Sequence, residues 1–135
     1  MPDNRERLKL DIVRRLDEVC STHPMGHQAS KARRYIYTNN AHARFELMFE
    51  QNPSVPANLW VLESAVSSIL DKDLAFRRSP SDRLYVRTGK NGDRLYGRHS
   101  SMEKMPQLGK ADLVCFNIRS MTQLKRILDA LDSES

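Results

Sequence analysis

Several features that would place this chain in a specialised class are missing from its sequence. It has only two cysteines, Cys20 and Cys115, too few for a disulfide framework. No apolar run approaches the roughly 18 residues that a membrane helix needs, and the N-terminal residues lead into a charged segment without the apolar stretch of a secretory signal. These absences predict a cytoplasmic protein with buried free thiols and no membrane contact.

The short motifs that carry well-known chemistry are also missing. The sequence has no glycine-rich phosphate loop, no HExxH zinc motif and no GxSxG nucleophile turn. Cys20, His23, His27 and His42 are close in sequence but lack the two ordered ligand pairs of a structural zinc site. We therefore expect no metal and no cofactor, and we interpret these histidines as loop residues.

The composition is that of an ordinary globular domain. Of its 135 residues, 39% are apolar and 29% are charged, which argues against wholesale disorder and allows a core without covalent crosslinks. No internal repeat, low-complexity block or long linker divides the chain. Residues 1–135 are therefore expected to form a single domain.

Two segments have the spacing of amphipathic helices. Apolar residues recur every three or four positions over 4–20, and again from Leu124 to Leu131 after a capping box at Ser120 to Gln123. A short helix is also expected over 65–71, with Ser64 as its N-cap. Residues 100–103 have capping-box form too, and predict a single helical turn.

The strand pattern completes the fold prediction. Residues 43–50 alternate as a half-buried strand does, and 59–62 and 111–118 are short apolar runs. Residues 34–38 are rich in β-branched and aromatic side chains and favour a strand, although 29–37 could instead form a helix. Residues 74–81 are interpreted as a linker. This order predicts an α+β fold: a mainly antiparallel sheet of about four to six strands, with an N-terminal and a C-terminal amphipathic helix packed on it.

The most distinctive stretch is 81–98. Its Asn91-Gly92 pair is a strong signal for a two-residue hairpin turn, because both residues tolerate positive φ. Such a turn places Arg87 opposite Tyr96. Because strand side chains alternate, one face of the hairpin would then carry four arginines and two tyrosines, namely Arg83, Tyr85, Arg87, Arg94, Tyr96 and Arg98.

Positive charge is concentrated in two segments. Residues 76–98 hold seven basic and two acidic side chains, a net charge of +5, which equals that of the whole chain. Residues 21–44 hold four basic side chains and no acidic one, whereas 45–75 carry a net charge of −4. If the fold brings the two basic segments together, their fields add and favour a polyanionic partner. The alternative is that the hairpin arginines and tyrosines only form favourable cross-strand pairs.

These observations predict a small basic nucleic-acid-binding domain, for example the recognition part of a DNA-processing system. The expected phosphate contacts are Arg83, Arg87, Lys90, Arg94 and Arg98, with Tyr85 and Tyr96 stacking on bases and Lys31, Arg33 and Arg34 as a second contact.

Two other classes of function remain open at this point. The chain could be a protein-interaction or adaptor module, in which the acidic 45–75 segment and the basic hairpin dock on complementary partner surfaces, or on a second copy in a homo-oligomer. It could also be a metal-independent nuclease or phosphodiesterase, with Arg98, His99 and Glu103 grouped around a phosphate.

Overall fold

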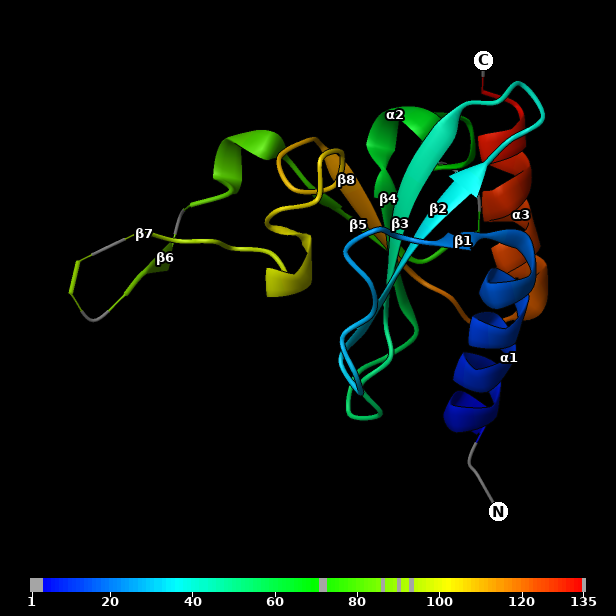
Figure 1. The fold of residues 1–135 in the computed structure, drawn as a ribbon, viewed down its shortest axis with the longest axis horizontal. Coiled ribbons are helices and arrows are strands. Elements are labelled where there is room, and N and C mark those ends of the chain that lie inside the picture. The colour runs from blue at the N-terminus through cyan, green and yellow to red at the C-terminus, as the bar shows by residue number, and fades with distance from the viewer. Residues whose placement is uncertain (1–3, 71–72, 86, 90, 93, 135) are drawn as a thin grey trace.

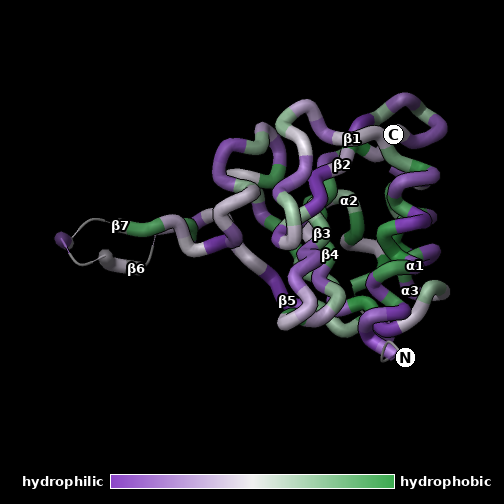
Figure 2. Tube along the Cα trace, turned by 60° about the horizontal axis from the view of Figure 1, so that its bottom comes forward, coloured by the Kyte–Doolittle hydropathy of each residue, from purple (hydrophilic) through white to green (hydrophobic). Residues whose placement is uncertain are grey.

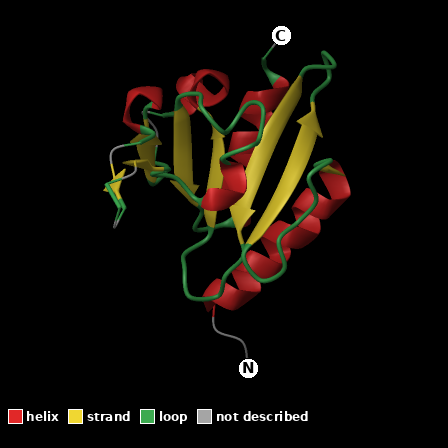
Figure 3. Cartoon of the chain, turned by 60° about the vertical axis from the view of Figure 1, so that its left-hand side comes forward, coloured by secondary structure: helices red, strands yellow, loops and turns green. Residues whose placement is uncertain are grey.

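Alternating apolar residues build a six-stranded antiparallel sheet in the computed structural model, which describes residues 4–70, 73–85, 87–89, 91–92 and 94–134. Helices α1 (Asn4–Val19) and α3 (Met121–Asp132) pack on this sheet (Figures 1 and 3). The predicted α+β fold is therefore confirmed. In spatial order the strands are β1 (Ser21–Thr22), β2 (Ala32–Thr38), β3 (Arg44–Glu50), β4 (Asn58–Leu62), β8 (Leu113–Asn117) and β5 (Phe76–Ser79).

The β2–β3 hairpin forms the longest ladder of the sheet. Its seven residue pairs run from Ala32 opposite Glu50 to Thr38 opposite Arg44, so the segment that was ambiguous in the sequence is a strand. Asn39 closes the turn, because its Oδ1 accepts from two backbone N–H groups in the loop. Its Nδ2 donates to the carbonyl oxygens of Leu131 and Glu134, which ties the turn to the end of α3.

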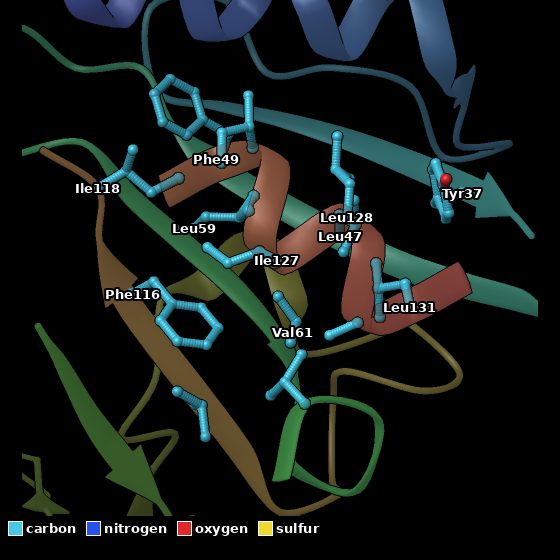
Figure 4. Close-up of a cluster of buried hydrophobic side chains, with 14 of the residues drawn as sticks. Tyr37, Leu47, Phe49, Leu59, Val61, Phe116, Ile118, Ile127, Leu128 and Leu131 are labelled. Carbon is cyan, nitrogen blue, oxygen red and sulfur yellow. The ribbon is translucent and has the colours of Figure 1, made fainter. Parts of the chain in front are cut away.

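The main core lies between the helices and one face of the sheet. The predicted stripe of α3, from Leu124 to Leu131, is buried there with Leu47, Phe49 and Phe116 of the strands (Figure 4). The hydropathy of the chain follows the same division, with apolar segments where α1 and α3 face the strands (Figure 2). One half of the capping box at the start of α3 is confirmed, since Ser120 Oγ accepts from Gln123 N at 3.3 Å. In the other half, Gln123 Oε1 accepts from Arg119 N at 2.8 Å, one residue before the N-cap.

The other face of the sheet is covered as well, and this corrects the prediction that 43–50 is half-buried. A second cluster packs Met48 of β3 and Trp60 of β4 against Met102 and Leu108. Residues 99–110 therefore act as a lid over β3 and β4. Period-two alternation in a sequence cannot reveal such a cover, because the covering segment is distant from both strands in the sequence.

Three local predictions are also wrong. The short helix α2 (Glu63–Val66) begins before Ser64 and no side chain caps it; it continues into a 3-10 turn (Ser67–Ile69). Residues 76–79, interpreted as a linker, form strand β5, because their backbone pairs with β8. The two-residue strand β1 was not predicted. Within the described part of the chain, no helix is both long and apolar enough to cross a membrane.

Candidate nucleic-acid interface

Residues 81–97 form a projecting segment, which we call the arm. It begins with a 3-10 turn (Ser81–Arg83) and continues into β6 (Arg87–Thr88) and β7 (Arg94–Leu95), which pair with each other and form a sheet of their own. The arm extends away from the six-stranded sheet, at the end of the molecule opposite α1 (Figures 1 and 2). At its base, Gly97 N donates to Leu84 O at 2.6 Å. The predicted hairpin is therefore present.

The register of this hairpin differs from the prediction by one residue. Arg87 lies opposite Leu95 and Thr88 opposite Arg94, whereas a two-residue turn would have placed Arg87 opposite Tyr96. The observed pairing leaves an odd number of residues between Thr88 and Arg94, whereas a hairpin with a two-residue turn always leaves an even number between paired residues. Gly92, at φ +82°, instead donates its N–H to Gly89 O at 3.1 Å. The expected single face of arginines and tyrosines depended on the two-residue turn, so that face does not form.

Arg98 lies inside the protein, at the base of the arm, with 8% of its surface exposed. Its five N–H donors make five hydrogen bonds: Nε to Ser79 Oγ at 2.8 Å, Nη1 to the carbonyls of Leu108 and Gly109 at 3.1 and 3.4 Å, and Nη2 to the carbonyls of Ser79 and Ala111 at 2.6 and 2.5 Å. Burial lowers the pKa of Arg98 from its ordinary value. The guanidinium therefore joins β5, the arm and the lid, and has no donor left for a phosphate.

The two tyrosines of the arm have different roles. Tyr96 donates its hydroxyl to Gly109 O at 2.6 Å and anchors the arm to the lid; burial raises the pKa of this hydroxyl. The Tyr85 ring lies against it at a centroid distance of 5.8 Å, and 37% of Tyr85 is exposed. Leu95 is 41% exposed. Tyr85 is thus the tyrosine with a ring surface accessible to a partner.

The other basic residues of 76–98 divide into two groups. Arg77 places its guanidinium 5.2 Å from the Trp60 ring centroid, and Arg78 lies 3.5 Å from a Glu63 carboxylate oxygen. Arg83 is exposed on the arm. The backbones of Arg87 and Arg94 lie in β6 and β7, and Lys90 lies outside the described residues. The basic side chains of the arm are therefore Arg83, Arg87, Lys90 and Arg94, and its acidic side chains are Asp82 and Asp93.

The second basic segment does not lie beside the arm. Arg33 and Arg34 belong to β2, Lys31 precedes this strand, and Arg44 begins β3. Strands β3, β4 and β8 separate β2 from β5, which leads into the arm. Arg34 is 7% exposed and donates to the carbonyls of Met25, Gly26 and Ser101 at 2.8, 2.6 and 3.1 Å.

The neighbouring Arg33 donates to Tyr35 Oη at 2.7 Å and to the carboxylate of Asp17 at 3.1 Å. Lys31 is exposed at the same remote edge of the sheet. The fields of the two basic segments therefore do not combine on one surface.

The structure also does not bring Arg98, His99 and Glu103 together around a phosphate position, as a nuclease site would require. His99 accepts the N–H of Ser101 on its own Nδ1 at 3.2 Å and thereby caps the 3-10 turn Ser100–Met102, so the cap is His99 rather than Ser100. This contact uses a backbone donor that a phosphate would need. Glu103 is exposed, and Arg98 points its guanidinium into the interior.

A buried pair that the sequence analysis missed links the lid to the sheet. His23 Nε2 lies 2.7 Å from Glu46 Oε2, and each side chain is 4% exposed. Glu46 Oε1 accepts from the N–H groups of Gln107 and Leu108 at 2.6 and 2.9 Å. Because His23 Nδ1 accepts from Met25 N at 3.0 Å, its proton lies on Nε2 and the ring is a neutral donor to Glu46.

His23 lies in the loop that follows β1, as expected of a loop histidine, but it is buried, which we did not predict. Together with Glu46, it lines a cavity of about 410 Å³ that also borders Arg44 and Lys104. Both ring nitrogens are engaged, so the pair holds the lid in place and is not available to move protons to a substrate. The 23 residues that separate the two side chains hide this contact from sequence patterns.

Cysteines and metal ligands complete the inventory of reactive groups. Both cysteines are free thiols, Cys115 buried and Cys20 partly buried, in agreement with the prediction. In the residues that the structure describes, three or more histidine, cysteine or carboxylate side chains do not come close enough to hold a metal ion. Comparison of the chain with protein-family models, with curated proteins and with solved structures found no match.

Proposed function

We propose that this protein binds nucleic acid through the arm. The observation that carries the proposal is the projection of a basic two-stranded ribbon beyond the body of the fold (Figure 1). A two-stranded ribbon has the dimensions of the DNA major groove. Arg83, Arg87, Lys90 and Arg94 supply phosphate contacts in this proposal. Tyr85 supplies an exposed ring for stacking on a base.

The contacts that the acidic residues of 45–75 make within the chain favour a nucleic-acid partner over a protein partner. An adaptor that docks through 45–75 needs free carboxylates, but Glu46 is buried against His23. Glu50 accepts from Trp60 Nε1 at 2.9 Å, and Glu63 lies beside Arg78. Three of the five acids of that segment are thus engaged within the chain. A cytoplasmic location belongs to the same proposal, because free thiols suit a reducing compartment.

The test is a set of binding titrations with labelled duplex DNA, single-stranded DNA and RNA between 50 and 200 mM salt. Replacing Arg87 and Arg94 by alanine should weaken binding and reduce the slope of log K against log salt by about 1.8 on duplex DNA, because each lost phosphate contact removes about 0.9. The control replaces Arg7 and Arg14 of α1, which are exposed and carry the same total charge.

The proposal expects the α1 variant to bind as the unmodified protein does. Equal weakening by both variants would show that only net charge matters, and would refute a role for the arm. Absence of binding to all three nucleic acids, or binding independent of salt, would refute the proposal altogether.

A further inference from the structure

A second cavity lies at the opposite end of the molecule from the arm. It has a volume of about 430 Å³, within the range of about 300–1,000 Å³ typical of small-molecule sites. The N-terminal half of α1 forms one wall, and residues 49–53, at the end of β3 and in the loop that follows, form another. Leu10, Val13 and Phe49 provide its apolar lining.

The distinctive group in this cavity is Lys9. The residue is only 7% exposed, although it lies on a surface helix. Its Nζ donates to Asn52 O at 2.7 Å and to Val55 O at 3.0 Å, and no carboxylate of the described residues comes within 4.0 Å of it. An ammonium group has three donors, so one remains after these two bonds.

A buried ammonium group that has no carboxylate within ion-pair distance is costly for a fold, and such groups are concentrated at binding sites. Burial lowers the pKa of Lys9 from its ordinary value, as expected for an ammonium group in this situation. Glu50 raises the pKa of Lys9 and Arg5 lowers it, but burial has the largest effect. A bound anion would offset that cost, because it would supply a counter-charge at ion-pair distance and an acceptor for the third N–H.

The rest of the lining fits an anion with an apolar body. Arg5 and Arg33 also border the cavity, against a single acid, Glu6. Arg33 is paired with Asp17, so Arg5 and Lys9 are the cations that we assign to the ligand. Leu10, which also lines the cavity, is 62% exposed, so an apolar ligand body would cover it.

We propose that this cavity binds a small organic carboxylate, with the carboxylate on Lys9 Nζ and Arg5 and the apolar body between Leu10, Val13 and Phe49. The site does not depend on the arm, because α1 and the arm lie at opposite ends of the fold (Figure 1). Nucleic-acid binding and carboxylate binding can therefore fail separately.

The test uses 2-naphthylacetate as the probe and its neutral isostere 2-naphthylacetamide as the matched comparison, with binding followed by amide NMR shifts. The two compounds share an apolar body and differ in the charged group. A charge-assisted hydrogen bond predicts that the carboxylate binds about tenfold more tightly than the amide. The largest shifts should fall on residues 5–13 and 49–55.

Lys9→Met keeps the length of the side chain and removes its charge, so it should abolish the preference for the carboxylate. Since Lys9 also holds the 52–55 loop, a second variant is needed in case this one does not fold. Arg5→Glu changes an exposed side chain and should weaken the carboxylate by about threefold. Arg14→Glu makes the same charge change on the same helix, away from the cavity, and should leave binding unchanged.

Equal affinities for the carboxylate and the amide would overturn the proposal. It would also fail if the shifts mapped to the arm, if binding did not saturate, or if Arg14→Glu weakened the carboxylate as much as Arg5→Glu did.

Discussion

Replacement of Arg98 by methionine is the sharpest test of how the arm is held. Methionine keeps an unbranched apolar stem but has no donor. The substitution would leave four backbone carbonyls and Ser79 Oγ without the partner that they have at the base of the arm. These acceptors come from β5 and from the lid, so the loss falls on the contact between the arm and the body of the fold.

The magnitude follows from the five hydrogen bonds. A single bond to a charged group contributes about 1.5–3 kcal/mol, but the five share one charge and are not additive. Removal of one partner from a buried charged network costs about 3–5 kcal/mol, which we take as the expected loss in free energy of unfolding. With a denaturant slope of about 1.5 kcal/mol per molar urea, the unfolding midpoint should fall by about 2 M or more.

The assay is urea unfolding followed by far-UV circular dichroism, with Arg83→Met as the matched control. Arg83 is exposed on the arm, so its replacement should change stability by no more than about 0.5 kcal/mol. A lysine at position 98 should give an intermediate loss, because one ammonium group cannot reach five acceptors around a planar guanidinium.

If Arg98→Met and Arg83→Met were equally stable, the structural role assigned to Arg98 would be refuted. Such a result would indicate that Arg98 is exposed and would support the prediction that it contacts phosphate. A stability loss combined with normal nucleic-acid affinity at low urea would instead agree with both the structure and the proposed role of the remaining arm residues.

Three further predictions concern the body of the fold. Glu46→Gln should lower the free energy of unfolding by about 2–3 kcal/mol in urea titrations, because an amide replaces the carboxylate that accepts from His23 and from two lid N–H groups; an unchanged midpoint would contradict the role of Glu46 in holding the lid. Ser120→Ala should cost about 1 kcal/mol, the usual value of an N-cap, whereas Ser120→Asp should be neutral in the same measurement. Burial raises the pKa of the Cys115 thiol from 9.0 to about 11, so the folded state holds this proton more tightly than the unfolded state does. The contribution of Cys115 to the free energy of unfolding should therefore be fully present below pH 9 and should be lost as the pH rises toward 11. A Cys115→Ala variant should show a smaller loss of stability over the same pH range.

Much of the fold could be predicted because its signals are local. The spacing of apolar residues over 4–20 and 124–131 is enough to form α1 and α3, and Ser120 caps α3 through a residue only three positions away. The β2–β3 hairpin likewise needs only neighbouring strands and a short turn. In each case the interacting residues are close in sequence, so periodicity and capping chemistry contain the information.

Some errors are local, namely the register of the 81–98 hairpin and the caps of the short helices. The others arise where the partner is distant in sequence. Strand β5 has two arginines among its four residues, and only the β8 backbone beside it makes it a strand. His23 looks like a loop residue until Glu46 and the lid enclose it. Lys9 is one of many charged residues on a helix until the 52–55 loop places two carbonyls on its ammonium group.

The sequence by itself determined the two long helices, most strands of the sheet, the presence of a hairpin within 81–98 and the concentration of positive charge there, because these depend on neighbouring residues. Only the tertiary structure decided which arginines are engaged inside the fold. Arg34 and Arg98 are arginines like any other in the sequence, but folding brings carbonyl oxygens from separate segments around each guanidinium. Carbonyl oxygens from segments that are distant in the sequence come close together only when the chain folds. An arginine surrounded by such carbonyl oxygens stabilises the fold and is buried away from any phosphate.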